Sequence, residues 1–199
     1  MTASQIPTGD RIVGVDAGGT LVRLAVSQPG APLSEALVMT TPASEDGGPE
    51  PLISLLKLAP LDPSKVLGAV AGVTKVSRPG VTDRWEDLLR AVFPNATLRV
   101  VPDFQIAYHG AVSGGIGVAA LAGTGSVIYG EDAQGNRARV GGRGWEYGDE
   151  GSGAWLTTEA LRRTLRALDG FETSATLARL VGGYLKETED AGRLAQSAR

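Results

Sequence analysis

The sequence contains one arrangement twice: an apolar stretch, a tight turn rich in glycine and threonine, and a second stretch that leads back. The first copy spans residues 11–27 around a turn at 16–20, and the second spans residues 118–130 around a turn at 123–126. Each copy has the pattern of a β-hairpin with a glycine-rich turn. The copies do not form a sequence repeat of the solenoid kind. We therefore interpret them as equivalent parts of two related domains with a cleft between them.

The hydrophobic pattern along the chain alternates between strand and helix spacing, which is typical of an α/β protein. Strands are expected at residues 11–15, 21–27, 36–40, 67–73, 98–101, 118–122, 127–130 and 137–140. Helices are expected at residues 52–58, 83–93 with Asp83 as N-cap, from just after Asp103 through Ser113, at 154–168 and at 173–188. The glycines at 114–117 interrupt the pattern, so we expect an N-terminal domain over residues 1–113 and a partial second domain over 114–199.

The composition excludes several classes of function. A net charge of −3 argues against a broad nucleic-acid surface, which usually needs a basic stripe. The absence of cysteine excludes a disulfide framework and a cysteine-ligated metal or iron–sulfur site, and a single histidine, His109, excludes a multi-histidine site. No apolar run has the length of a membrane helix, and residues 1–10 lack a signal-peptide pattern, so we expect a cytoplasmic protein.

Glycine is the residue in excess, at 28 of 199 positions, about twice its usual share. The glycines cluster beside the apolar strands, where they permit positive φ angles and a close approach of backbone N–H groups to a ligand. The turn at 16–20 adds the Asp16 carboxylate and the Thr20 hydroxyl, and the turn at 123–126 adds two further hydroxyls. A phosphoryl-transfer site needs such donors together with a carboxylate for Mg²⁺. Either turn alone is also what an ordinary hairpin contains.

Two further places carry carboxylates. Asp103 follows an apolar strand and precedes a helix, where ligands bind in α/β folds, so it is either a general base or a helix cap. Residues 148–153 combine two carboxylates and a hydroxyl with three glycines at the start of a helix. Acidic residues are favourable there because of the helix dipole. Three glycines in six residues indicate instead that a ligand approaches closely.

The order and spacing of these motifs resemble the N-acetylglucosamine kinases and the wider BadF/BadG/BcrA/BcrD ATPase family, within the actin–hexokinase–Hsp70 superfamily. The motifs that carry the resemblance are Asp16–Thr20, Asp103, Gly123–Ser126 and Gly148–Gly153 with Trp145 and Trp155 beside it, within residues 12–168. The resemblance implies an α/β, actin-like ATPase (ribonuclease H-like) fold with two related domains around a cleft, the second one incomplete. It also implies an ATP-dependent sugar kinase that uses Mg²⁺.

The resemblance implies a role for each matching residue. Asp16 would help to place Mg²⁺, Asp103 would take the proton from a sugar hydroxyl, and Trp145 would either stack on a sugar face or pack within the protein. The two phosphate-binding turns would consist of Gly18, Gly19 and Thr20, and of Gly123, Thr124, Gly125 and Ser126. The sugar hydroxyls would be held by Asp149, Glu150, Gly151 and Ser152. His109 is expected to be structural.

The sequence departs from the family pattern in two places. The loop after the third strand, residues 40–45, lacks the asparagine that contacts the sugar in N-acetylglucosamine kinases, which leaves the sugar open. Family members also continue for roughly another hundred residues, which leaves activity open. A non-catalytic sugar- or nucleotide-binding module and a self-associating fragment are the alternatives, whereas the iron–sulfur activators of the superfamily are excluded by the lack of cysteine. We expect ATP and a sugar as ligands and a homodimer as the assembly.

Overall fold

The computed structural model describes residues 9–171, 173 and 175–185. The chain divides into two compact units. The first comprises the residues up to Ala119 together with Tyr129–Asn136, and the second comprises Ala120–Ile128 together with the residues from Arg137 onward. The division therefore runs through the middle of two strands. The domain boundary expected between residues 113 and 114 stays a prediction.

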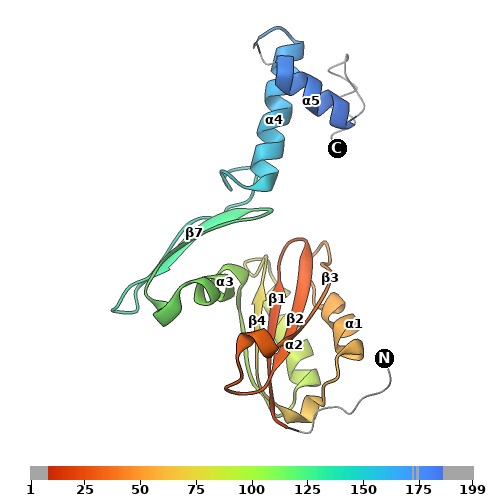
Figure 1. The fold of residues 1–199 in the computed structure, drawn as a ribbon, viewed down its shortest axis with the longest axis vertical. Coiled ribbons are helices and arrows are strands. Elements are labelled where there is room, and N and C mark those ends of the chain that lie inside the picture. Colours follow the sequence, from red (N-terminus) through yellow and green to blue (C-terminus); the bar gives the residue numbers. More distant parts are fainter. Residues whose placement is uncertain (1–8, 172, 174, 186–199) are drawn as a thin grey trace. The chain divides into compact units, whose positions relative to one another are not determined.

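The first unit is built on a five-stranded sheet with the order β3-β2-β1-β4-β5 (Figure 1). The strands are β1 Arg11–Ala17, β2 Leu21–Ser27, β3 Leu37–Pro42, β4 Val66–Val73 and β5 Thr97–Pro102. The hairpin β1–β2 and the pair β2–β3 are antiparallel, whereas β4 runs parallel to both β1 and β5. Strands β1, β3, β4 and β5 thus run in one direction and end at the same edge of the sheet, whereas β2 runs the opposite way.

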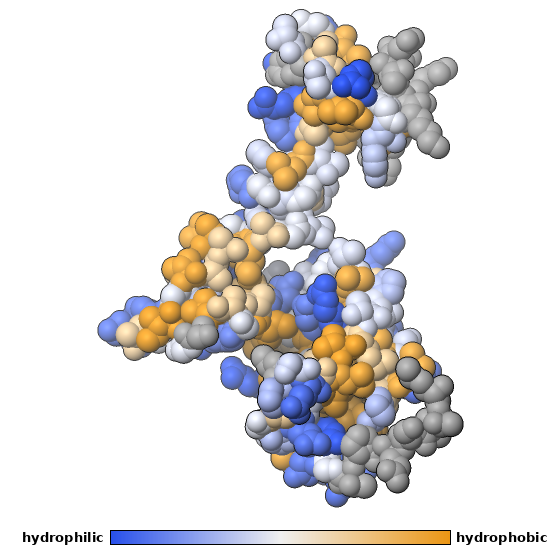
Figure 2. Space-filling view, viewed as in Figure 1, coloured by the Kyte–Doolittle hydropathy of each residue, from blue (hydrophilic) through white to orange (hydrophobic). Residues whose placement is uncertain are grey.

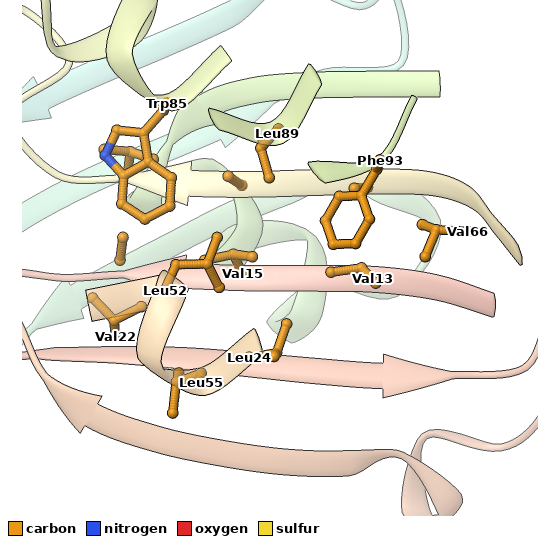
Figure 3. Close-up of a cluster of buried hydrophobic side chains, with 14 of the residues drawn as sticks. Val13, Val15, Val22, Leu24, Leu52, Leu55, Val66, Trp85, Leu89 and Phe93 are labelled. Atoms are coloured by element: carbon orange, nitrogen blue, oxygen red, sulfur yellow. The ribbon is translucent and has the colours of Figure 1, made fainter. Parts of the chain in front are cut away.

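Three helices cover this sheet. They are α1 Glu50–Leu58, α2 Val81–Val92 and α3 Asp103–Ala111, and short 3₁₀ turns lie at Leu33–Glu35, Pro63–Lys65 and Ser113–Gly115. Helices α1 and α2 pack on the face that carries Val13 and Val15, and Figure 3 shows Leu52, Trp85 and Leu89 reaching into that core. Helix α3 lies on the opposite face, where Ile106 packs against Gly72. The alternating burial of the strands follows from the period of two in side-chain direction.

The start of α2 differs from the sequence-based expectation. Asp83 was predicted as its N-cap, and this is wrong, because the helix begins at Val81 and Asp83 lies in its first turn. The preceding Gly80 has a φ of 76°, and no side chain caps the helix. A left-handed glycine reverses the chain here without a side-chain acceptor. Asp83 keeps a favourable position relative to the helix dipole.

The remaining elements form a three-stranded sheet and two helices. The strands β6 Gly117–Ala122, β7 Ser126–Glu131 and β8 Arg137–Gly141 are adjacent in that order, and α4 Gly153–Leu168 and α5 Ala175–Leu185 follow. Figure 2 shows apolar surface along these strands, where Val118, Ile128 and Val140 are exposed. The end of the predicted last helix, residues 186–188, lies outside the described residues. None of the described helices is long and apolar enough to cross a membrane.

The core of the first unit gives a direct test of packing. Leu55 and Leu58 lie on the same helix, α1, but Leu55 is 3% exposed and Leu58 is 73% exposed. We expect Leu55→Ala to lower the free energy of unfolding by about 2–5 kcal/mol. Leu58→Ala is the matched control and should change it by less than about 0.5 kcal/mol. Denaturant unfolding of the two variants checks the difference, and equal losses would contradict this description of the core.

Candidate active site

The first glycine-rich turn is a tight connection at the carboxyl end of β1. The Gly18 N–H donates to the Leu21 carbonyl over 3.0 Å, which closes the hairpin. The turn is fixed from both sides, because Ala43 N–H donates to the Thr20 carbonyl (2.9 Å) and Thr74 N–H donates to the Ala17 carbonyl (2.8 Å). Gly19 and Thr20 are exposed. The turn therefore presents its tip to solvent on a fixed base.

The glycines of this turn are not required by a left-handed backbone. Neither Gly18 nor Gly19 has a φ in the positive region, although positive φ was one expected reason for the glycine clusters. A Cβ at Gly19 would have no neighbour within 4 Å. Because glycine has no side chain, the backbone at this turn is left uncovered. Uncovered backbone N–H groups are the groups that an anion contacts.

Asp16 lies on β1 directly before this turn and is paired across the hairpin. Arg23 Nη1 lies 2.7 Å from Asp16 Oδ2, and the two residues are register partners on β1 and β2. Both side chains are more than one-third exposed, at 37% for Asp16 and 48% for Arg23. A solvent-exposed ion pair of this kind contributes little to stability. The Asp16 carboxylate is therefore available to a cation that binds it more strongly than Arg23 does.

Asp103 is the first residue of α3 and follows the last residue of β5 directly. Burial raises the pKa of its carboxyl above the ordinary aspartate value, and the nearby Asp16 carboxylate adds to the effect. Hydrogen bonds from the Phe104 N–H (2.9 Å to Oδ1) and the Thr74 hydroxyl lower the pKa and offset part of the rise. A partly buried carboxyl with a raised pKa beside a second carboxyl is a frequent feature of functional sites.

Asp103 fits the alternative role of a helix cap only in part. The N-cap position of α3 is Pro102, which has no side-chain hydrogen bond to offer, and Asp103 stands one residue inside the helix. Its bond to the Phe104 N–H does satisfy one of the first-turn amides. The carboxylate therefore has a local structural role and also faces Thr74 and Asp16 at the end of the parallel strands.

The donor set of this edge fits a hard cation. Asp16 and Asp103 supply carboxylate oxygens, the Thr74 hydroxyl bonds to Asp103, and Thr20 follows Asp16 in the first turn. Oxygen ligands of this type suit Mg²⁺. Among the described residues there is no cluster of three or more acidic, histidine or cysteine side chains. A magnesium ion at this edge would therefore take its remaining ligands from phosphate oxygens and water, which is the usual arrangement for Mg²⁺ with nucleotides.

The second glycine-rich turn, in the other unit, is joined to the start of α4. The Gly153 N–H donates to the Gly123 carbonyl (2.8 Å) and the Ala154 N–H to the Thr124 carbonyl (3.2 Å). The next amide, Trp155 N–H, donates to the Ser152 hydroxyl (3.1 Å). The first-turn amides of α4 are thus used within the protein.

The acidic glycine loop closes onto this second turn through Asp149. Asp149 is 8% exposed and has a left-handed φ of 57°. Its Oδ1 accepts from the Gly144 N–H (3.2 Å), and a Cβ at Gly125 would lie 2.7 Å from its Oδ2. The Ser126 hydroxyl donates to the Glu150 carbonyl over 2.9 Å. Gly125 is therefore a glycine because of the close approach of Asp149, and the loop and the turn form one structure.

An open pocket of about 550 Å³ lies beside this turn. Its lining residues are Gly123, Thr124, Trp145, Gly153, Ala154, Thr157 and Thr158. Trp145 is 53% exposed, so its ring is presented to the pocket and to solvent rather than packed in a core. Ser152, in contrast, is fully buried and caps α4. Glu150 and Gly151 are exposed in the same loop.

Sequence reasoning missed the loop after β3 as a built part of the first site. Arg84 on α2 reaches Asp46 Oδ2 and Glu50 Oε1, each over 2.6 Å, and Trp85 Nε1 donates to the Gly47 carbonyl (2.9 Å). The bonds from Arg84 hold the pKa of the Asp46 carboxyl well below its usual range. The feature of the sequence that could have indicated this loop is the run Gly47–Gly48–Pro49. Position 48 must be glycine, because a side chain there would collide with Arg84.

Thr74 and Lys75 were also missed, since no motif marks them. The Thr74 hydroxyl bonds to Asp103, and Lys75 has a φ of 57° and donates to the Glu45 carbonyl (2.6 Å). A non-glycine residue in the left-handed region is uncommon. His109 lies 3.7 Å from Glu131, on the part of α3 remote from Asp103. Its expected structural role stays a prediction.

A parallel-stranded core with a hairpin turn and a carboxylate at its strand ends defines a class of protein, the actin-like ATPase fold, and the predicted fold class is confirmed. The sequence matches the profile of the BadF/BadG/BcrA/BcrD ATPase family over residues 13–196. The chain belongs to this family.

Among the similar proteins are several that are named as amino-sugar kinases or putative amino-sugar kinases. The chain is 37% identical over 84 residues to an N-acetylmuramic acid/N-acetylglucosamine kinase of Clostridium acetobutylicum, a match that covers 42% of this chain and 28% of that protein. The structure resembles a putative N-acetylglucosamine kinase from Chromobacterium violaceum, with a TM-score of 0.70 and 26% identity over 97% of this chain and 72% of the other. A second structure, a putative N-acetylglucosamine kinase from Porphyromonas gingivalis, shares the fold at a TM-score of 0.63 and 21% identity, over 93% of this chain and 70% of the other.

The contact between Gly125 and Asp149 gives a test of the second turn. We expect Gly125→Ala to displace the Asp149 carboxylate from the Gly144 N–H and to destabilise its unit by about 1–3 kcal/mol, since overpacking has costs of this size. Gly123→Ala is the matched control for folding, because a Cβ there would have no neighbour within 4 Å. Thermal unfolding and the amide chemical shift of Gly144 report the effect. An undisturbed Gly144 amide in Gly125→Ala would contradict the described contact.

Proposed function

We propose that this protein transfers the γ-phosphate of ATP to a hydroxyl of N-acetylglucosamine or a related amino sugar. The observation that carries the proposal is Asp103, a partly buried carboxylate with a raised pKa at the end of the parallel strands, beside Asp16 and the turn at 18–20. The family membership and the amino-sugar kinases among its relatives support the same reaction. Because the match covers 28% of the curated relative, activity and substrate are proposals for this chain.

The phosphates of ATP would be held by the two glycine-rich turns. The turn at Gly18, Gly19 and Thr20 is exposed on a fixed base, and the turn at 123–126 is held by α4 and by the acidic loop. Backbone N–H groups in such turns make anion-binding concavities. In this proposal both turns bind phosphate groups of ATP. Asp16 would hold Mg²⁺ through water, and the ion would neutralise charge on the phosphate oxygens.

Asp103 would act as the general base. Its carboxylate would accept the proton of the sugar hydroxyl while that oxygen forms a bond to the γ-phosphorus. The bond between the γ-phosphorus and the bridging oxygen of ADP would break, and ADP would leave with the electron pair. Positioning and charge neutralisation supply most of the rate enhancement in phosphoryl transfer. The Thr74 hydroxyl, which bonds to Asp103, would keep the carboxylate oriented.

The sugar would lie against the acidic loop of the second unit. Asp149, Glu150 and Gly151 are the proposed contacts, whereas Ser152 is fully buried as the cap of α4. The exposed ring of Trp145 offers an apolar face on which a pyranose ring could stack. Asp149 also touches Gly125, so one residue would join the sugar loop to the phosphate turn. The cytoplasmic location and the homodimer stay predictions.

Replacement of Asp103 tests the reaction directly. We expect Asp103→Asn to lower the rate of N-acetylglucosamine-dependent ADP release by about 10²–10⁴-fold, the usual cost of losing a general base, while sugar affinity stays within a few-fold. Asp87→Asn on α2 is the matched control, because that carboxylate is exposed and makes only a long contact with Arg90. A coupled ADP-release assay measures both. Unchanged activity in Asp103→Asn would leave Asp103 as a helix-capping residue only, and sugar binding without turnover in the wild type would make the protein a binding module.

The pH dependence of the rate follows from the direction of the Asp103 pKa shift. A general base must be deprotonated, so kcat/KM rises with pH through the pKa of that group. Because burial and Asp16 raise the Asp103 pKa, the acidic limb should lie above the value of about 3.9 for an ordinary aspartate. The pH profile of ADP release shows where the limb falls. A limb at or below the ordinary aspartate value would contradict the assignment.

A further inference from the structure

Three aromatic rings join the helix that begins at Asp103 to strand β7. Phe104 and Tyr108 lie four residues apart on α3 and therefore share one face of the helix. The ring centroid of Tyr129 on β7 is 5.2 Å from that of Phe104 and 5.0 Å from that of Tyr108. Tyr108 and Tyr129 meet edge to face at 82° and are both buried. Such geometry is favourable beyond simple burial. The rings fix α3 against β7.

The Tyr108 hydroxyl adds a polar connection at the same place. It lies 3.0 Å from the Gly115 carbonyl and 3.2 Å from the Gly117 carbonyl, and it accepts from the Glu131 N–H over 3.3 Å. A phenol has one hydrogen, so it donates to one of the two carbonyls at a time while it accepts from Glu131. One buried oxygen thus contacts the link from α3 to β6, the first residue of β6 and the last residue of β7.

These contacts lie at the base of the strand pair that carries the second turn. Gly117–Ala119 and Tyr129–Asn136 belong to the first unit, whereas the middle of the strand pair, Ala120–Ile128, belongs to the second. The second turn, at 123–126, is part of that middle segment. Helix α3 therefore has Asp103 at its first residue and is fixed, through Tyr108, to the base of the strands that carry the other candidate phosphate-binding turn.

We propose that Tyr108 is a positioning residue: by tying α3 to the base of β6 and β7, it holds α3, and with it Asp103 at the first residue of the helix, in the position that the general base needs. The proposal rests on the proposed function of Asp103. Within the part of the chain that the structure describes, the hydrogen-bond partners of the Tyr108 hydroxyl are Gly115, Gly117 and Glu131 rather than Asp103, so Tyr108 would act through the helix. A displacement of about 1 Å at a reacting group is enough to lower a rate strongly.

The variant Tyr108→Phe keeps the ring and removes only the hydroxyl. We expect hydrogen exchange of the amides of residues 104–108 to become about two- to tenfold faster, the range for the loss of one neutral hydrogen bond. We also expect kcat for sugar phosphorylation to fall at least about tenfold, with the sugar KM within twofold. The matched control is Tyr184→Phe on α5, which removes the hydroxyl of an exposed tyrosine and should change neither quantity.

The two readouts separate the possible outcomes. If Tyr108 has only a structural role, Tyr108→Phe will lower the melting temperature but leave kcat unchanged at temperatures well below it, and this result would overturn the proposal. Unchanged hydrogen exchange in residues 104–108 would overturn it as well. If Asp103→Asn retains full activity, the proposed function fails, whereas faster exchange confined to α3 in Tyr108→Phe still supports the mechanical link. If Tyr108→Phe does not fold, Tyr129→Phe is the substitute variant, because it keeps the ring and removes the 2.6 Å bond to Glu131. It is expected to lower kcat at constant KM, and an unchanged kcat overturns the proposal.

Discussion

The parallel pairing of β1, β4 and β5 is the interaction on which the candidate site depends. Ala17 is the register partner of Val73, and Val73 is the partner of Pro102, so the three strands end level with one another. The residues that follow, Gly18, Thr74 and Asp103, must then lie side by side. The hydrogen bond from Thr74 to Ala17 and the bond between Thr74 and Asp103 are direct results. Burial of the sheet under α1 and α2 makes any slip of this register costly.

The second unit uses another means to hold its turn. Its strands end in a turn whose carbonyls accept the first amides of α4, and Asp149 fills the space that a side chain at Gly125 would occupy. A turn with its carbonyls committed to a helix has its remaining backbone on the other side. The two turns therefore have similar sequence patterns but are held by different elements. The ends of strands hold the turn of the first unit, and a helix and an acidic loop hold the turn of the second.

The sequence predicted the strands, the helices and the fold class well, because hydrophobic periodicity reports directly which residues are buried. It did less well where the structure depends on contacts between distant residues. Asp83 was wrong as a cap because Gly80 reverses the chain first, and Ser152 was missed as a cap because it was considered only as a ligand. The loop fixed by Arg84 could not be predicted, since its partners are more than thirty residues away.

The central proposal is that the two glycine-rich turns bind the phosphates of ATP. The most direct measurement is backbone amide chemical-shift mapping by NMR, with Mg²⁺ and a non-hydrolysable ATP analogue added in the presence of N-acetylglucosamine. The account predicts that the amides of Gly18, Gly19 and Thr20 and those of residues 123–126 shift together, with one dissociation constant. Shifts confined to one turn, or two separate dissociation constants for the two turns, would contradict it.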